Sequence, residues 1–157
     1  MNNLSSNHHK PKCFLVGCLL ENNIKEDVIE HLEELSGLAF TLNFEIFGTL
    51  IVKLIKINPN TFIGSGKVQE ISGIVHQNQI DFVIFDDDLS STQIRNLENL
   101  IKTRVMTRTE IILEIFKNNA KTAASKTQVE IARLKYMLTR LTRQWEHLER
   151  QRGGIGH

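Results

Sequence analysis

The chain has 157 residues, of which 41% are hydrophobic and 24% charged, which is enough for one globular core or for a small domain with an extension. No apolar run reaches the roughly 18 residues of a membrane span, and the polar residues 1–12 lack the apolar stretch of a secretory signal. We therefore expect a disordered stretch over residues 1–12 and a cytoplasmic protein. The two cysteines, Cys13 and Cys18, are expected on opposite faces of one strand and hence as free thiols.

The net charge of +1 conceals a division along the chain. Residues 1–116 hold 10 basic and 15 acidic side chains, a net of −5, whereas residues 117–157 hold nine basic and three acidic ones, a net of +6. A basic end on an acidic body indicates that this end meets a polyanion.

Strand-like and helix-like patterns alternate over the first two-thirds of the chain. The predicted strands are 13–18, 41–47 with a continuation over 50–57, 81–86 and 104–107; the predicted helices are 24–35, 67–76, 90–101 and 109–117. The sequence from Ser90 to Gln93 has the pattern of a capping box at the start of its helix. This alternation predicts an α/β fold over residues 13–118, with a mostly parallel sheet flanked by helices.

The last part of the chain, residues 119–157, is predicted to be a long basic coiled-coil-type α-helix followed by a glycine-rich hairpin tip. Apolar residues at alternating spacings of three and four form a narrow stripe, typical of a helix that pairs with another helix; they are Ile131, Leu134, Leu138, Leu141, Trp145 and Leu148. We call these six residues the seam. Heptad numbering from Ile131 places Arg133, Arg140, Arg143 and Arg150 at outward positions.

Two further motifs invite a ligand. Gly64-Ser65-Gly66-Lys67 resembles a phosphate loop, but Thr61 and Val68 stand where a Walker A motif needs glycine and Ser or Thr. We favour a tight turn in which Ser65 caps a helix, while an anion at the helix N-terminus stays open. Asp86-Asp87-Asp88 follows a predicted parallel strand, and we interpret it as a solvated loop and predict no metal site.

The basic segment is the strongest functional signal. Arginine binds phosphate bidentately and stacks on bases, and the glycines after Arg152 leave backbone amides open to close approach. The pattern favours binding to RNA.

Several segments, in order along the chain, resemble the HflX-type GTPase family. They are Phe62-Ile63-Gly64-Ser65-Gly66-Lys67-Val68-Gln69-Glu70-Ile71, Val83-Ile84-Phe85-Asp86-Asp87-Asp88-Leu89-Ser90, Arg108-Thr109-Glu110-Ile111-Ile112-Leu113-Glu114-Ile115-Phe116, Gln128-Val129-Glu130-Ile131-Ala132-Arg133-Leu134 and Trp145-Glu146-His147-Leu148-Glu149-Arg150-Gln151-Arg152-Gly153-Gly154-Ile155-Gly156. The resemblance extends from about residue 13 to the end of the chain.

The resemblance implies an N-terminal α/β domain whose helical hairpin reaches into the large (50S) ribosomal subunit. In the family a following GTPase domain splits stalled or stress-inactivated ribosomes, and GTP and Mg²⁺ would belong to that domain. The residues implied in contact with ribosomal RNA are Arg140, Arg143, Arg150, Gln151, Arg152, Gly153 and Gly154.

The chain departs from the family pattern in two ways. It stops at His157, before the second hairpin helix and the Walker A loop, and Thr107 stands where the family has aspartate. We therefore expect a truncated, non-catalytic form without a cofactor. Two alternatives stay open: a nucleotide (ATP)-binding module that uses Gly64, Ser65, Gly66 and Lys67, and a self-associating vestigial protein that forms a homodimer through the seam.

Overall fold

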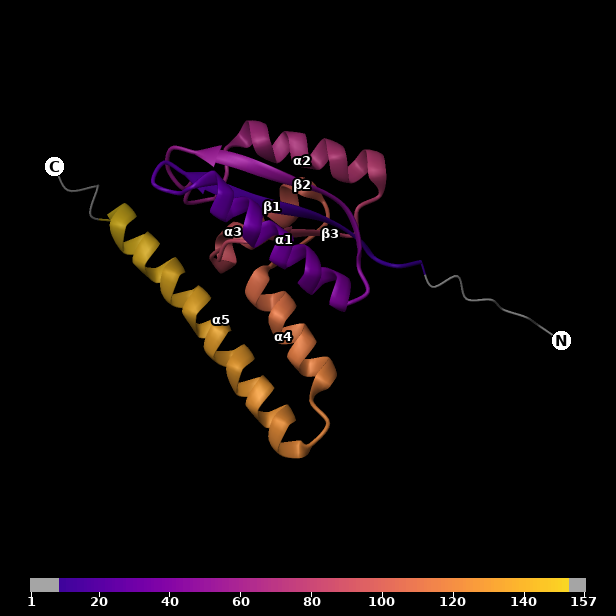
Figure 1. Ribbon diagram of the computed structural model, residues 1–157. Coiled ribbons are helices and arrows are strands. Elements are labelled where there is room, and N and C mark those ends of the chain that lie inside the picture. The colour runs from indigo at the N-terminus through magenta and orange to yellow at the C-terminus, as the bar shows by residue number, and fades with distance from the viewer. Residues whose placement is uncertain (1–8, 153–157) are drawn as a thin grey trace.

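The computed structural model describes residues 9–152, and for residues 142–152 it describes the backbone alone (Figure 1). Of the disorder expected over residues 1–12, the part at residues 1–8 lies outside this range, and Lys12 belongs to a strand instead. The glycine-rich tip that includes Gly153 and Gly154 also lies outside this range. The elements are β1 (Lys12–Leu20), α1 (Lys25–Thr41), β2 (Glu45–Leu54), α2 (Ser65–Asn78), β3 (Phe82–Phe85), α3 (Ser91–Ile101), β4 (Arg104–Thr107), α4 (Arg108–Asn119) and α5 (Ala123–Arg152).

The four strands form one sheet in the order β2-β1-β3-β4, and every neighbouring pair is parallel. The predicted α/β fold with a parallel sheet is therefore confirmed. Strand β1 lies inside the sheet, and its residues from Cys13 to Cys18 are all buried, which explains their apolar sequence.

Helices cover both faces of the sheet. One core contains Val68 and Ile71 of α2 together with Leu97 of α3, and the other contains Leu35 of α1 and Ile111 of α4. Cys13 and Cys18 belong to different cores, as the alternation along a strand requires, and both are free thiols. Burial raises the pKa of Cys13 to about 11 and that of Cys18 further, so neither is a reactive thiolate.

The structure moves one predicted boundary. Helix α1 continues to Thr41, so a strand starting at residue 41 is wrong; β2 is one continuous strand from Glu45 to Leu54. The helix continues because its buried stripe, Val28, Leu32, Leu35 and Ala39, keeps helical spacing beyond residue 35.

The starts of the next helices show whether the two predicted helix caps, Ser90 and Ser65, are correct. Ser90 and Gln93 form the predicted capping box at α3, with Ser90 Oγ accepting from the Gln93 N–H at 3.1 Å. Ser65, in contrast, is not a cap: it is the first residue of α2, and the N-cap is Gly64, which has no side chain to offer.

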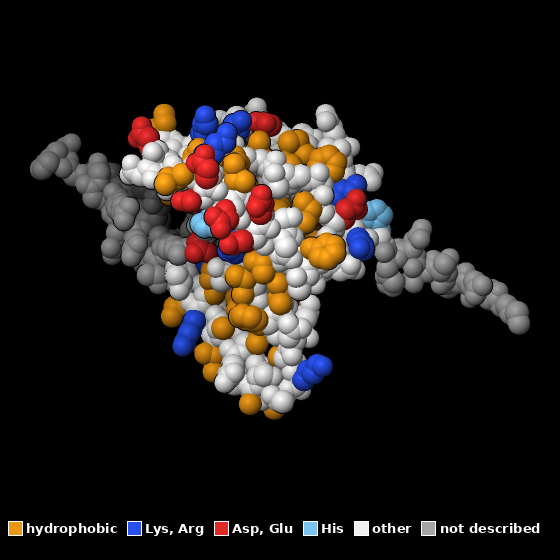
Figure 2. All heavy atoms as spheres, viewed as in Figure 1, with side chains coloured by type: hydrophobic (Ala, Val, Ile, Leu, Met, Phe, Trp, Pro, Cys, Tyr) orange, Lys and Arg blue, Asp and Glu red, His pale blue; other side chains and the backbone are white. Residues whose placement is uncertain are grey.

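The last two helices form a hairpin. Helix α4 leads away from the body of the domain, and α5 returns beside it and passes along the body (Figure 1). Thr122 and Ser125 cap the start of α5 through reciprocal hydrogen bonds of 3.1 and 3.0 Å. On the face seen in Figure 2, acidic side chains gather over the body and hydrophobic ones over the hairpin. Within residues 9–152, no helix is both long and apolar enough to cross a membrane.

Candidate functional site

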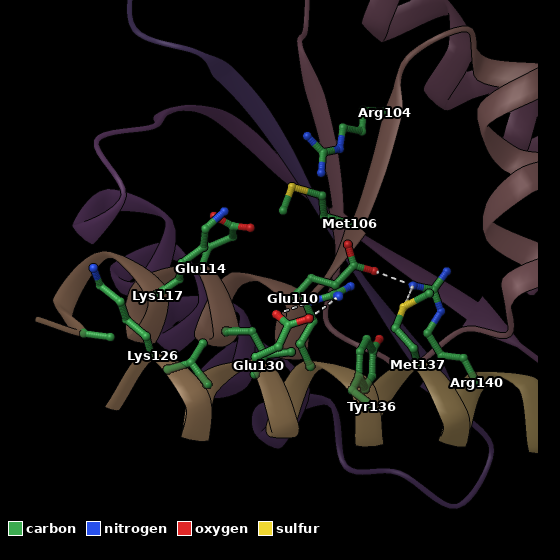
Figure 3. Close-up of a pocket in the computed structure, with 14 residues that line it drawn as sticks. Arg104, Met106, Glu110, Glu114, Lys117, Lys126, Glu130, Tyr136, Met137 and Arg140 are labelled. Carbon is green, nitrogen blue, oxygen red and sulfur yellow. Dashed lines mark hydrogen bonds and ion pairs between the residues drawn. The ribbon is translucent and has the colours of Figure 1, made fainter. Parts of the chain in front are cut away.

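One face of α5 is fixed to the body by polar contacts. Arg140 Nη1 donates to Glu110 Oε1 of α4 at 3.1 Å, and the hydroxyl groups of Tyr136 and Thr107 lie 2.6 Å apart. We call these two pairs the latch. The Arg140 guanidinium also lies over the Tyr136 ring, 5.7 Å from its centroid, and 3.5 Å from the sulfur of Met137 (Figure 3). The latch therefore fixes α5 against the start of α4.

The predicted outward position of Arg140 is wrong. Its exposed fraction is 8%, and its Nε–H is buried without a hydrogen-bond partner. The heptad numbering fails here because α5 contacts the body through a different pair of residues at helical spacing, Tyr136 and Arg140. An arginine held in this way has no free face for RNA.

Burial dominates the electrostatics of the latch. It raises the pKa of Glu110 above its ordinary value, although the charge of Arg140 acts in the opposite direction. Burial also raises the pKa of Tyr136, against the effect of its hydrogen bond with Thr107. Thr107, where the resemblance implies an aspartate, is fully buried and accepts from the Glu110 N–H at 3.4 Å, so it caps α4 while it contacts α5.

The seam points away from the body. The exposed fractions of its first four residues are 46% for Ile131, 54% for Leu134, 64% for Leu138 and 51% for Leu141. Large side chains at this exposure on one helix face indicate a surface made for another element. For the remaining seam residues, Trp145 and Leu148, the structure describes the helical backbone only.

Arg133, which the heptad numbering also places at an outward position, is half exposed and forms an ion pair of 2.6 Å with Glu130 one turn before it. The other expected RNA contacts lie further along the chain. The backbone of Arg143, Arg150, Gln151 and Arg152 is helical, their side chains are not described, and Gly153 and Gly154 lie outside the described residues. The structure thus places most of the predicted RNA-contacting residues in the last turns of α5 and the residues that follow it.

The described side chains at the glycine turn before α2 do not converge on a ligand site. Lys67 forms an ion pair of 2.9 Å with Glu70 on the same helix, and both side chains are almost half exposed. A Cβ atom added at Gly64 or Gly66 would meet no atom within 4 Å, so neither glycine is required by a close approach. The glycines instead fit a turn that leads from the loop into α2.

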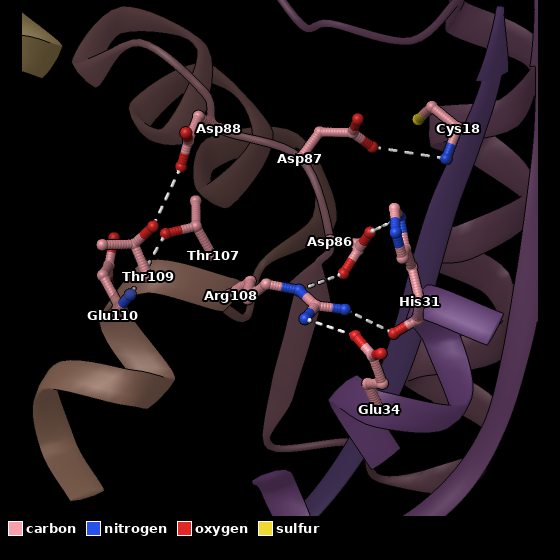
Figure 4. A network of polar contacts seen from close by, with 10 residues as sticks. All are labelled: Cys18, His31, Glu34, Asp86, Asp87, Asp88, Thr107, Arg108, Thr109 and Glu110. Atoms are coloured by element: carbon pink, nitrogen blue, oxygen red, sulfur yellow. Dashed lines mark hydrogen bonds and ion pairs between the residues drawn. The ribbon is translucent and has the colours of Figure 1, made fainter. Parts of the chain in front are cut away.

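We expected the acidic loop after β3 to be a solvated loop. Its side chains instead take part in a polar network with neighbouring elements (Figure 4). Arg108 Nε donates to Asp86 at 2.6 Å, and Arg108 also pairs with Glu34 of α1 at 3.2 Å. Asp87 accepts from the backbone N–H of Cys18 at 3.3 Å, and burial raises its pKa. These contacts join β3, α4 and α1. Nowhere in the described part of the chain do three or more His, Cys, Asp or Glu side chains gather as a metal site would need.

A cavity of about 590 Å³ lies between α4 and α5, next to the latch (Figure 3). The charge pattern gave no sign of it, because the cavity forms only where α5 folds back beside α4, and β4, α4 and α5 all contribute to its lining. The sequence signal that could have found it is the second stripe on α5, from Val129 to Arg140, which repeats at helical spacing but mixes apolar, aromatic and charged residues.

Comparisons with known proteins agree with this architecture. A family described as "GTP-binding GTPase N-terminal" matches residues 29–117, and one described as "GTP-binding GTPase Middle Region" matches residues 119–157. GTPase HflX of Flavobacterium psychrophilum is 41% identical over 92% of this chain and 35% of its own length. GTPase HflX of Escherichia coli is 42% identical over 82% of this chain and 30% of its own.

Among solved structures, a GTP-binding protein from the hyperthermophilic archaeon Sulfolobus solfataricus in complex with GDP has the same fold, with a TM-score of 0.61 and 21% identity. The match covers 89% of this chain and 42% of that one. The chain spans about a third of the length of the two HflX proteins. By these matches it belongs to the HflX-type GTPase family and corresponds to the N-terminal region of that family.

Proposed function

We propose that this chain is a non-catalytic, cytoplasmic ribosome-binding region that contacts RNA of the large subunit through the end of α5. The proposed contact residues are Arg143, Arg150, Gln151, Arg152, Gly153 and Gly154. Arg140 is not among them, because it is buried against Glu110. GTP and Mg²⁺ have no proposed role in this chain.

The observation that carries the proposal is the attachment of a basic arm to an acidic body. Helix α5 runs 30 residues, about 45 Å at 1.5 Å per residue. Residues 117–157 carry a net charge of +6 and the rest of the chain −5. The part of α5 beyond Arg140, residues 141–152, is about 18 Å long at 1.5 Å per residue, and it can contact RNA while the acidic body is repelled from the phosphates.

Co-sedimentation with isolated large subunits tests the proposal. The affinity should fall steeply as salt rises from about 50 to 200 mM, because each neutralised phosphate releases counterions. The triple variant Arg143→Glu/Arg150→Glu/Arg152→Glu should lose most of the binding. A triple variant at Lys53, Lys56 and Lys67, which lie on the body, should bind like the parent.

Absence of binding at low salt would contradict the proposal, and so would equal loss in the two triple variants. In the second case the interaction would depend on total charge and not on the end of α5.

The exposed seam favours a second candidate, self-association. In water, the exposed Ile131, Leu134, Leu138 and Leu141 side chains leave apolar area unburied, and a second copy of α5 offers a matching stripe. We propose an antiparallel homodimer through the seam. Light scattering over a dilution series should show a dimer, and a monomer throughout the micromolar range would contradict it.

A further inference from the structure

We propose that the groove between α4 and α5 binds an amphipathic anion, a small molecule with an apolar body and a phosphate or carboxylate head. The groove has a volume of about 590 Å³, within the range of small-molecule sites. It lies on the hairpin and not at the end of α5, so the proposal is independent of ribosome binding.

Helices α4 and α5 are joined at both ends of the groove. The latch joins the helices near the body, through the Glu110–Arg140 and Thr107–Tyr136 pairs. At the other end the short connection between Asn119 and Ala123 joins them covalently. The groove lies between these two connections, lined by residues of both helices.

Apolar side chains from three elements form the walls of the groove. Met106 comes from β4, Leu113 from α4, and Val129 and Met137 from α5. Methionine adapts its shape to an apolar partner because its side chain is unbranched and flexible. This lining fits an alkyl chain or a hydrophobic ring.

The charges around the groove favour an anionic head. Five basic and three acidic side chains line it, a net of +2; they are Arg104, Lys117, Lys126, Arg133, Arg140, Glu110, Glu114 and Glu130. Two of the acids are already paired, Glu110 with Arg140 and Glu130 with Arg133.

Lys117 and Lys126 project from α4 and α5 at the end of the groove near the hairpin connection (Figure 3). Within the described part of the chain, neither belongs to an ion pair. Both lysines are exposed at the edge of the groove, where their ammonium groups are suited to a phosphate or carboxylate head. At the opposite end, the buried Nε–H of Arg140 is a further unmet donor in the wall.

Isothermal titration calorimetry with decanoate and decyl phosphate tests the proposal, with uncharged decyl maltoside as the comparison and all three below their micelle concentrations. Both anions should bind with one molecule per chain, and the uncharged compound at least about tenfold more weakly. Comparison of the two anions distinguishes a carboxylate head from a phosphate head.

Two variants locate the site. Lys117→Glu/Lys126→Glu should weaken both anions at least about tenfold, while the matched variant Lys53→Glu/Lys56→Glu on the body should leave binding unchanged. Val129→Trp should abolish binding by filling the groove, and circular dichroism confirms that each variant is folded. The proposal would be overturned if neither anion bound, or if several molecules bound per chain. It would also be overturned if the two lysine variants lost the same amount of anion affinity.

Discussion

The two faces of α5 reverse the usual distribution of polar and apolar residues. Arg140, on the face toward the body, is 8% exposed, whereas Leu138, two residues earlier on the opposite face, is 64% exposed. A helix stabilised by its own domain alone would bury its leucines and expose its arginines. The reversal indicates that the domain holds α5 by a few polar contacts and leaves its apolar face largely exposed.

The latch orients α5 on the body, whereas the seam is the face that α5 offers for binding. Buried ion pairs contribute little net stability over apolar packing, yet removal of one partner is costly, so they fix geometry more than they add stability. Substitutions in the latch should therefore change the stability of the fold and the docking of α5. Substitutions in the seam should change the association of two chains.

The largest effect is expected for Arg140→Ala. It leaves the Glu110 carboxylate buried without its partner, and the free energy of unfolding should fall by about 3 kcal/mol. Chemical denaturation measures this, and hydrogen exchange should show lost protection in α5. The matched control is Arg133→Ala, whose ion pair with Glu130 is exposed to solvent and screened, so its loss should lower the free energy of unfolding far less than Arg140→Ala does.

A second variant keeps this test informative. Glu110→Gln/Arg140→Met replaces both charges by neutral groups of similar size and should recover much of the loss. Equal stability of the Arg140→Ala and Arg133→Ala proteins would show that the latch does not hold α5.

Local patterns in the sequence predicted the elements well because each depends on near neighbours. The wholly apolar run of β3 and the Ser90–Gln93 capping box depend on residues within one or two turns, and both are confirmed. The end of α1 was missed because Leu42 and Phe44 continue the apolar character beyond the helix, so hydrophobicity does not mark its end.

The orientation of α5 could not be predicted from its own sequence. Periodicity predicts which residues share a face, but it does not show which face meets the body, since both stripes have helical spacing. The partners that decide it, Thr107 and Glu110, precede Tyr136 and Arg140 by about 30 residues. The acidic loop is similar: Asp86 is paired by Arg108 from another element, and no local pattern marks that contact.

The next largest effect is expected for Leu138→Lys on the opposite face. In the proposed dimer it places two charges in the seam and removes two buried leucines, a loss of about 2.5 kcal/mol, which is nearly a hundredfold in Kd. Analytical ultracentrifugation measures the Kd, and the unfolding of the monomer should not change.

Ile55→Lys is the matched control, since Ile55 is 89% exposed on the body and outside the seam. A dimer that tolerates Leu138→Lys but not Ile55→Lys would move the interface away from α5.

A smaller effect is expected for Tyr136→Phe. It removes one hydrogen bond and leaves the fully buried hydroxyl of Thr107 without that partner, at a cost of about 1 kcal/mol. Thr139→Val, which removes an exposed hydroxyl on the same helix, should change stability by less than about 0.5 kcal/mol. Equal unfolding midpoints for the two variants would show that the Tyr136–Thr107 contact adds nothing to docking.

The smallest effect concerns the pH dependence of stability. Burial raises the pKa of Glu110 above its ordinary 4.5, so between 4.5 and the folded value the native state holds more protons than the unfolded state. Stability from this group is then full below 4.5 and falls as pH rises through that window. Glu110→Gln cannot titrate, so its stability relative to the parent should improve as pH rises.

Glu130→Gln should show the opposite trend, because the hydrogen bond from Arg133 lowers the pKa of Glu130. Its carboxylate stabilises the native state above pH 4.5, and this contribution is lost as pH falls through the folded pKa. The variant should therefore become less stable relative to the parent as pH rises from the folded pKa to 4.5, and the difference should then stay constant. Denaturation curves between pH 3 and 8 measure both differences. Trends of the same sign would mean that burial does not govern the titration of Glu110, and the electrostatic contrast between the buried latch and the exposed Glu130–Arg133 pair would fail.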